Sequence, residues 1–296
     1  MGMIDVSIYG NLILDKVCRV SQYRHASSNN CTLMTSSPGG IANVAAAIAR
    51  LNNNLSLTVN SVVGDDIASS ITKQWFLDLA EKTDARIDIV LEPSPTHTSE
   101  AVIICDTDNN NRGSIVQWGA CTELSSLTDH DSRWCHIIYA DKLPNLDINS
   151  LKEISKKSII SLDLCSDNQT RETKDKILSA LPHVDYLFAS SEEAQCLTGR
   201  TTDVGACQEI SKHIRLTPII HNPSGSVFFD RGSNQAKQVS TPILVERGAN
   251  VLGAGDNFAS AFISFYLSCT KVENLTLEKA IEYAHIEATN YILKNK

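Results

Sequence analysis

Short apolar runs rich in β-branched residues alternate along this chain with longer segments whose apolar residues recur every three or four positions. The short runs predict strands, and the longer segments predict helices. Strands are expected at residues 6–9, 57–63, 135–140, 158–162, 186–189 and 218–220. Helices are expected at residues 41–51, 67–80, 174–181, 191–197, 204–214, 255–269 and 277–293. Such alternation predicts an α/β fold, in which a doubly wound, mostly parallel sheet carries helices on both faces.

Two stretches break this alternation. Residues 11–37 are polar and rich in Ser, Asn and Cys, and residues 91–118 contain a strand pair at 101–105 and 114–118 joined by the turn-rich segment 106–113. We interpret both stretches as parts of one small β-sheet that forms a lid on a single domain of 296 residues. The edges of an open sheet need cover, so a homodimer through the lid is expected.

Composition and charge exclude several classes of protein. With 42% apolar and 20% charged residues, the chain is typical of a globular protein with a substantial core. It has 26 Lys and Arg against 34 Asp and Glu, a net charge of −8, which argues against a nucleic-acid partner because phosphate backbones attract basic surfaces. Its most apolar helical stretch, residues 258–267, is about half as long as a membrane span, so no membrane partner is expected. Nine cysteines without a C-x-x-C pair, and a start without a basic stretch, predict free thiols in a cytoplasmic protein.

The strongest chemical signal is Gly253-Ala254-Gly255-Asp256, at the start of a predicted helix. Glycines on either side of a small residue let backbone N–H groups turn toward one point, and the helix dipole adds positive potential there. These residues therefore predict an anion hole, with the Asp256 carboxylate placed to take a proton from a hydroxyl that attacks a bound phosphate. The alternative is an ordinary turn in which Asp256 is the N-cap of the helix.

A second glycine pair, Gly39-Gly40, leads into the helix expected at 41–51 and places Asn43 in its first turn. An amide both donates and accepts hydrogen bonds, which suits the recognition of a polyol. Asp15 follows the first strand, at the end where open α/β sheets bind ligands. Each feature also has a purely structural interpretation: a turn with a helix cap for the glycine pair, and a solvated loop residue for Asp15.

Ser190 and Glu193 follow the strand expected at 186–189. A carboxylate at this position is suited to a hydrated Mg²⁺. The S-x-x-E spacing also matches a capping box, in which each of the two side chains accepts a hydrogen bond from the backbone of the other residue. The two interpretations are compatible.

Taken together, these motifs resemble those of the ribokinase-like (PfkB) family of carbohydrate kinases. Residues 251–258, VLGAGDNF, are similar to the family's C-terminal signature, and residues 39–45, GGIANVA, are similar to its N-terminal one. Further family features occur between them in the expected order: residues 63–66, Thr98 with Ala101, Arg112, Gly119-Ala120 and residues 193–199. Several weak motifs in one order rarely arise by chance, so the resemblance covers nearly the whole chain.

The resemblance implies an ATP-dependent kinase with Mg²⁺ as cofactor, which phosphorylates a hydroxyl group of a sugar or sugar-like small molecule. It assigns Asp256 as the catalytic base. The other assigned residues are Gly253, Ala254 and Gly255 for the anion hole, Asp15, Gly39, Gly40 and Asn43 for the substrate, Ser190, Ser224 and Gly225 for the nucleotide, and Glu193 for the metal through water. Few aromatic residues lie near these motifs in the sequence, which favours a sugar over a nucleoside, because base recognition usually employs stacking.

The chain departs from the family pattern at three places. Asn250 and Val251 replace an Asp-Thr pair associated with a monovalent-cation site, so activity is expected to respond weakly to K⁺ while Mg²⁺ stays essential. Ser190 replaces the usual Asn, and residues 221–225 form a shorter nucleotide loop in which Pro223 lacks a backbone donor. The alternative function is therefore a catalytically impaired sensor that binds a sugar or nucleotide. An NAD-dependent oxidoreductase is disfavoured, because the G-x-G-x-x-G fingerprint is absent.

Overall fold

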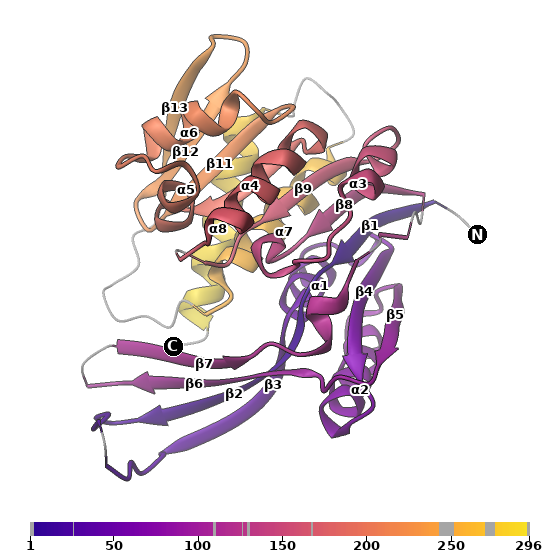
Figure 1. Cartoon of the computed structure of the whole chain (residues 1–296), viewed down its shortest axis with the longest axis vertical. Helices are drawn as coiled ribbons and strands as arrows, with labels where there is room; N and C mark the ends of the chain where they lie inside the picture. The colour runs from indigo at the N-terminus through magenta and orange to yellow at the C-terminus, as the bar shows by residue number, and fades with distance from the viewer. Residues whose placement is uncertain are drawn as a thin grey trace.

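The computed structural model describes residues 3–25, 27–108, 111–125, 127–128, 131–166, 168–242, 252–269 and 276–294. Its large sheet has the strand order β13-β12-β11-β10-β9-β8-β1-β4-β5 (Figure 1). The strands are β1 Ile4–Tyr9, β4 Leu57–Gly64, β5 Ile87–Ser94, β8 Ser132–Ile137, β9 Ile159–Asp163, β10 Tyr186–Ser190, β11 Thr217–Asn222, β12 Gly225–Asp230 and β13 Gln235–Ser240. Neighbouring strands from β11 to β5 are parallel, and β12 and β13 add an antiparallel edge.

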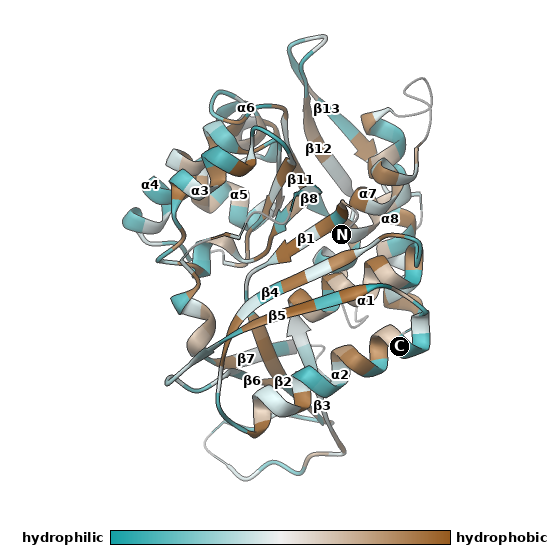
Figure 2. Cartoon of the chain, turned by 90° about the vertical axis from the view of Figure 1, so that its right-hand side faces the viewer, coloured by the Kyte–Doolittle hydropathy of each residue, from teal (hydrophilic) through white to brown (hydrophobic). Residues whose placement is uncertain are grey.

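Helices cover both faces of the large sheet. One layer consists of α1 Ile41–Leu51, α2 Ile67–Thr83, α7 Ala254–Ser268 and α8 Leu277–Lys294, and the other of α3 Ile148–Ile154, α4 Arg171–Ala180, α5 Ser191–Thr198 and α6 Asp203–Ser211. Each layer encloses its own apolar core: on β10, Phe188 packs with Phe262 of α7, whereas its neighbour Leu187 belongs to the cluster under α3 to α6. Figure 2 shows the largely apolar strands β1 and β4 of the large sheet, with helices in which polar and apolar residues alternate. The predicted α/β fold is therefore confirmed.

A second, small sheet has the order β3-β2-β6-β7 and projects from one end of the molecule (Figure 1). Its strands are β2 Leu12–Val20, β3 Leu33–Gly40, β6 Ser99–Asp106 and β7 Asn111–Gln117. Because side chains alternate along a strand, the sheet has two different faces. The inner face carries Ile13, Asp15, Ala101 and Ile103, which are buried, and the outer face carries Met34, Val102 and Ile115, which are exposed.

Several strand limits differ from those expected. Residues 91–94 belong to β5 of the large sheet, because they continue its parallel pairing with β4, whereas we had assigned them to the lid stretch 91–118. The other lid stretch, 11–37, ends too early, since β3 continues to Gly40. The strand expected at 135–140 ends at Ile137, where the backbone of Tyr139 turns left-handed (φ 52°).

Strand β5, the β12–β13 hairpin and helix α3 were not predicted. Strand β5 buries only Ser94, β13 only Val239, and α3 only Leu151 and Ile154, so these three elements carry too few buried apolar residues for a periodic signal. Strand β12 buries a short apolar run, Val227 to Phe229, and was missed all the same. Among the described residues, no helix is both long and apolar enough to cross a membrane.

One hydrogen-bond cluster joins the small sheet to the large one. Asp66, the N-cap of α2, accepts hydrogen bonds from the backbone N–H of Ser69 (2.8 Å) and from both the backbone N–H (2.7 Å) and the hydroxyl (2.8 Å) of Thr98. The Thr98 hydroxyl in turn accepts a bond from the Gly64 N–H (3.0 Å). The end of β4, the start of α2 and the start of β6 are thereby held at one point.

We predict that Thr98→Val destabilises the fold. The valine keeps the volume of Thr98 but leaves the buried Gly64 N–H without its acceptor, which costs about 1 to 3 kcal/mol of unfolding free energy. Urea unfolding of the variant and the wild type measures this difference. Thr201→Val, at an exposed position, is the matched control and should change stability by less than about 0.5 kcal/mol. Equal stability of all three proteins would contradict the role given to this cluster.

Candidate active site

The candidate anion hole lies at the start of α7. Gly253 is the N-cap residue, with a left-handed backbone (φ 76°), and no side chain caps the helix. An added Cβ at Gly255 would meet nothing closer than the His221 ring, at 3.7 Å, so the backbone beside Ala254 is open on that side. The first N–H groups of α7 therefore keep their capacity to bind an anion.

Asp256 follows directly, in the first turn of α7, and its side chain is buried. Its carboxylate accepts a hydrogen bond from the Asn43 amide of α1 (2.7 Å) and a second from the Tyr139 side chain. Burial raises the pKa of Asp256 to about 6, although these two hydrogen bonds work in the opposite direction. The N-cap alternative for Asp256 is wrong, because Gly253 occupies that position.

Asp15 lies on the inner face of the small sheet and is close enough to Asp256 to feel its charge. Burial, together with the charge of Asp256, raises the pKa of Asp15 to about 7. Asp15 comes from β2 of the small sheet and Asp256 from helix α7, which packs on the large sheet, so the two carboxylates meet where the small sheet joins the rest of the fold. A site bounded by two carboxylates suits a ligand that offers hydroxyl groups to both.

The glycine pair makes room for this arrangement. A Cβ on Gly39 would stand 2.2 Å from a carboxylate oxygen of Asp15, so any other residue would displace that side chain. Gly40 has a left-handed backbone (φ 64°), and a Cβ there would stand 2.0 Å from the Asn11 carbonyl oxygen. Both glycines are thus required by the geometry, and Asn43 follows on the first turn of α1.

A group of acidic side chains lies at the carboxyl ends of β8, β9 and β10. Asp163 is buried at the end of β9, where burial and the charges of Glu193, Asp256 and Asp141 raise its pKa well above the usual value. Burial likewise raises the pKa of Glu193 to about 7. One oxygen of Asp141 has no hydrogen-bond partner among the described residues and meets only the Lys142 ammonium, at 3.3 Å.

This acidic group fits a hydrated divalent cation better than a directly bound one. Carboxylate oxygens are the donors that Mg²⁺ prefers, and a cation among these carboxylates would favour their ionised forms, which burial disfavours. Within the described ranges, however, no three His, Cys, Asp or Glu side chains converge closely enough to hold a metal directly. Contact through water, as expected for Glu193, is compatible with this spacing.

The three residues expected to contact the nucleotide have structural roles of their own. Ser190 and Glu193 form the capping box of α5, with the Ser190 N–H donating to Glu193 (2.7 Å) and the Glu193 N–H donating to the Ser190 hydroxyl (3.2 Å). Ser224 lies in the turn between β11 and β12. Gly225 has a positive φ (147°) and packs against Val239. Their contact with a nucleotide stays a prediction, as does the K⁺ response, because Asn250 and Val251 lie outside the described residues.

Sequence reasoning missed several polar residues of this site. Tyr139 was placed inside a strand, although its left-handed backbone aims it at Asp256. Asp163 carried no motif that distinguished it from other strand ends. Asn11 is fully buried, and neither atom of its side-chain amide has a partner among the described residues. His221 stacks on Phe258 beside Gly255, and burial together with His285 lowers its pKa to about 4.

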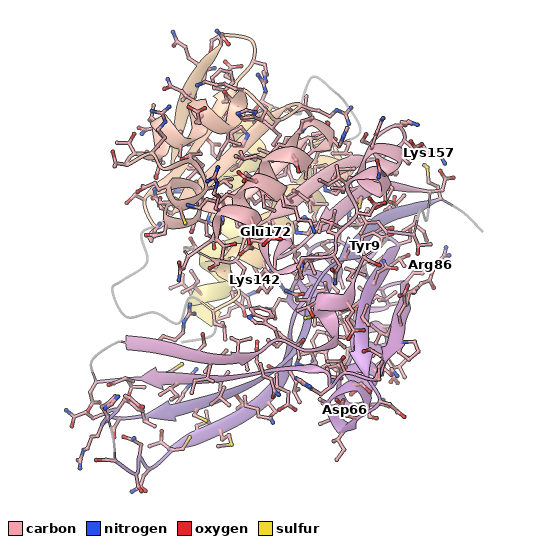
Figure 3. The ribbon with its side chains drawn as sticks, in the orientation of Figure 1. Tyr9, Asp66, Arg86, Lys142, Lys157 and Glu172 are labelled. Carbon is pink, nitrogen blue, oxygen red and sulfur yellow. The ribbon has the colours of Figure 1, made fainter. Side chains whose placement is uncertain are left out.

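Lys142 and Trp118 bring a cation and an aromatic ring to the same region. The Lys142 ammonium, labelled in Figure 3, lies 6.0 Å from the centre of the Trp118 ring at the end of β7. Trp118 packs against the inner-face cluster of Ile13, Ala101 and Ile103, and Leu252, which precedes the anion hole, packs against the same cluster. Trp118 therefore brings an aromatic ring near the site. The sequence positions of the aromatic residues had indicated that they lie away from it.

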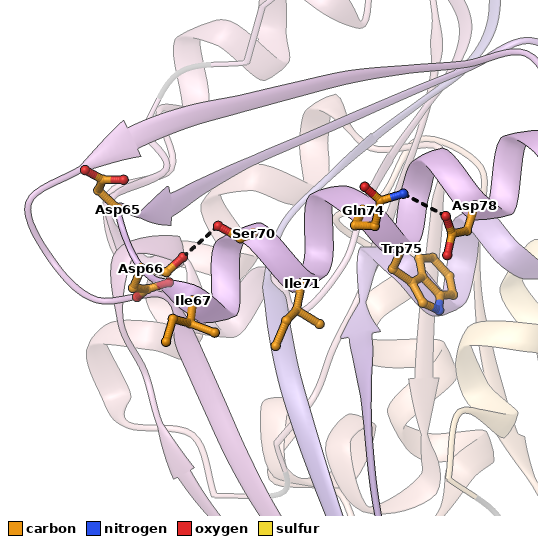
Figure 4. A pocket seen from close by; sticks show the side chains of 8 residues that line it. All are labelled: Asp65, Asp66, Ile67, Ser70, Ile71, Gln74, Trp75 and Asp78. Carbon is orange, nitrogen blue, oxygen red and sulfur yellow. Dashed lines mark hydrogen bonds between the residues drawn. The ribbon is translucent and has the colours of Figure 1, made fainter.

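A separate surface hollow lies along α2. It is lined by Asp65, Asp66, Ile67, Ser70, Ile71, Gln74, Trp75 and Asp78 (Figure 4). Its polar groups bond to one another along the helix, as Gln74 does to Asp78 (2.8 Å). None of these residues belongs to the group around Asp256.

Solved structures of kinases share this fold. The chain is similar to an adenosine kinase from Sinorhizobium meliloti, with 20% identity over 98% of this chain and 94% of that one and a TM-score of 0.77. It is also similar to a ribokinase from Arabidopsis thaliana complexed with ribose and ATP, with 18% identity, coverage of 99% and 93%, and a TM-score of 0.76. A probable sugar kinase from Rhizobium etli is similar as well, with 19% identity, coverage of 99% of this chain and 94% of that one, and a TM-score of 0.78. The fold is thus the ribokinase-like one.

The family follows from the sequence match. Residues 3–293 match the pfkB family of carbohydrate kinases, which is nearly the whole chain. The chain therefore belongs to the PfkB family. Its fold, with a mostly parallel nine-stranded sheet and a second small sheet, agrees with that assignment.

The raised pKa of Asp15 predicts a pH-dependent stability. Because the folded protein holds this proton up to about pH 7 and the unfolded chain releases it near 3.8, Asp15 lowers the unfolding free energy as pH rises through this window. Asp15→Asn, which cannot ionise, should therefore gain stability relative to the wild type between about pH 4 and about pH 8. Urea unfolding across this range measures the difference. Glu81→Gln, at an exposed position, is the control, and a pH-independent difference for Asp15→Asn would contradict the buried carboxylate.

Proposed function

We propose that this protein transfers a phosphoryl group from ATP to a hydroxyl group of a sugar-like small molecule, with Mg²⁺ as cofactor. The observation that carries the proposal is the position of Asp256, a buried carboxylate in the first turn of a helix whose N-terminus has no side-chain cap. A base and an anion-binding site are thereby adjacent, which is what phosphoryl transfer to an alcohol needs. Membership of the PfkB family and the fold shared with kinases support the same conclusion.

One group of residues is proposed to bind the acceptor and to take the proton from its hydroxyl group. Asp15 and Asn43 accept and donate hydrogen bonds to the acceptor's hydroxyl groups, with the backbone of Gly39 and Gly40 leaving space for them. Asp256 takes the proton from the hydroxyl that attacks, and its raised pKa of about 6 matches it to this task near neutral pH.

The phosphate side is served by backbone and by acidic residues. The N–H groups of Gly253, Ala254 and Gly255 stabilise the charge that develops on the transferring phosphoryl group. Mg²⁺, held through water near Glu193 and Asp163, would neutralise the charge of the ATP phosphates. Ser190, Ser224 and Gly225 are proposed to contact the nucleotide through the backbone of the turns in which they lie.

The small sheet is proposed to act as the lid of a single domain. Its inner face carries Asp15 on β2, and its apolar cluster packs against Leu252, which precedes the anion hole, so acceptor and lid would share one surface. The apolar character of this face and the Trp118 ring support an acceptor with an apolar or planar part. The sequence alone had favoured a sugar over a nucleoside, and this face favours an acceptor that carries a base. All nine cysteines are free thiols, which supports a cytoplasmic location.

Asp256→Asn should abolish most of the kinase activity. The asparagine keeps the size of Asp256, and Gly253 remains the N-cap, so folding should be preserved while the proton acceptor is lost. We expect turnover to fall by about 10² to 10⁴-fold with little change in acceptor KM. ADP release with ATP, Mg²⁺ and a panel of pentoses, hexoses and nucleosides identifies the acceptor and measures turnover.

Two further variants make this test specific. Tyr139→Phe removes only a hydrogen bond to Asp256 and should give a smaller loss, whereas Glu81→Gln, at an exposed position on α2, should change nothing. Near wild-type turnover of Asp256→Asn would refute its role as base. Binding of ATP without turnover of any acceptor in the panel would instead support the alternative of a sensor, for which the capping role of Ser190 and the Pro223 turn are the structural basis.

We also propose a homodimer through the outer face of the small sheet. Met34 (63% exposed), Val102 (36%) and Ile115 (70%) form an apolar surface there, and exposed apolar groups on an open sheet favour association with a second copy. Light scattering should give the mass of a dimer for the wild type and of a monomer for Ile115→Glu. Ile67→Glu, at an equally exposed position on α2, should leave the dimer intact. A monomeric wild type would contradict the proposal.

A further inference from the structure

Two cysteines meet at the base of the β2–β3 hairpin. Cys18 lies near the end of β2, and Cys31 lies just before β3, on the far side of the loop formed by residues 19–30. The Cys31 thiol donates a hydrogen bond to the Leu33 carbonyl (2.8 Å), and Leu33 pairs with Arg19, the neighbour of Cys18. The Cys31 sulfur is therefore held beside β2, where the Cys18 thiol is hydrogen-bonded to it.

The backbone fixes this contact. The N–H of Thr32 donates to the Arg19 carbonyl (2.7 Å), and the Thr32 hydroxyl donates to the same oxygen (2.9 Å). These bonds fix the residue next to Cys31 against the residue next to Cys18. The β2–β3 register itself pairs Cys18 with Met34, so the two thiols approach each other through these bonds at the end of the strand pair and not as a directly opposed pair.

A third thiol nearby is placed differently. Cys105 pairs with Arg19 in the β2–β6 register, so it lies on the inner face, where it packs against Ile103. Cys18, one residue before Arg19, faces the opposite side of the sheet. Cys105 can thus serve as an internal comparison: it is near Cys18 in the sheet but does not share its face.

The two thiols differ in reactivity. Cys31 is exposed, whereas Cys18 is half-buried. Burial, together with the charge and the hydrogen bond of Cys31, raises the pKa of the Cys18 thiol. Cys31 is thus the thiol that meets a reagent from solution first, and Cys18 is placed to attack second.

We propose that Cys18 and Cys31 form a reversible thiol–disulfide exchange site whose reaction partner is a small-molecule disulfide of the oxidised glutathione class. The Cys31 thiolate attacks one sulfur of the reagent, forms a mixed disulfide and releases one glutathione thiol. The Cys18 thiol then loses its proton and attacks the Cys31 sulfur, which forms the Cys18–Cys31 bond and releases the second glutathione thiol. Two protein thiols are oxidised and one disulfide is reduced, so the reaction balances. It does not depend on the proposed kinase function.

The bond would close the hairpin loop covalently. A cross-link across residues 19–30 restricts the unfolded chain and stabilises the β2–β3 pair. We expect the oxidised protein to melt at a higher temperature than the reduced one and to show slower amide hydrogen exchange in residues 19–30. Dithiothreitol should reverse both changes.

Mass spectrometry after exposure to oxidised glutathione tests the proposal on the full chain. The wild type should lose the mass of two hydrogen atoms, and blocking of the remaining thiols should show one cross-link. Trypsin cleaves after Lys16, Arg19 and Arg24, so the two cysteines fall on separate peptides that are joined only when the bond exists. Cys18→Ser should instead keep a glutathione adduct on Cys31, Cys31→Ser should give neither product, and Cys105→Ser should behave as the wild type.

Three outcomes would overturn the proposal: a lasting glutathione adduct on Cys31 of the wild type, a bond from Cys18 to Cys105, or a cross-link between two copies of the chain on a non-reducing gel. Circular dichroism of each serine variant shows whether it folds. The wild-type peptide map alone decides between the three outcomes and the expected bond, so the test holds even where a variant does not fold.

Discussion

The placement of the Asp256 carboxylate is the constraint on which the rest of the site depends. A buried carboxylate is expensive unless hydrogen bonds hold it, and Asp256 obtains them from Asn43 on α1 and Tyr139 after β8. These two partners must arrive from elements far apart in the chain, so the packing of α1 against α7 and the left-handed turn at Tyr139 belong to the same requirement. The backbone strain at Tyr139 is of a kind that persists only where the surrounding structure enforces it.

The glycines show how the small sheet meets this requirement. Asp15 reaches the site only because Gly39 leaves the space that its carboxylate fills, and α1 starts where it does only because Gly40 adopts a backbone closed to other residues. The same pair of glycines therefore sets the position of Asp15 on β2 and of Asn43 on α1. The Asp66 and Thr98 cluster fixes the other side of the sheet, where β6 begins.

Strong local signals in the sequence predicted the core of the fold and of the site, and long-range contacts account for what was missed. Residues 41–51 were predicted as a helix with its observed limits because apolar periodicity is local, whereas the resemblance to the PfkB family assigned Asp256, Asn43 and Asp15 to one site. Asp163, Tyr139 and His221 become functional candidates only through neighbours distant in sequence. Strand β13, at the edge of the large sheet, was not predicted because a strand with one buried residue carries almost no hydrophobic pattern.

Charge explains why these parts form one site rather than several. Asp15, Asp163, Glu193 and Asp256 all have pKa values raised chiefly by burial, and in the described part of the chain the Lys142 ammonium pairs with Asp141 instead. Such a cluster weakens the folded state when it ionises, so its cost must be offset by what the site binds. A divalent cation bound there would lower the pKa of the carboxylates around it, and it would also attract an anion bound at the start of α7. Binding of metal and phosphate would therefore be mutually favourable, with each reducing the electrostatic cost of the other.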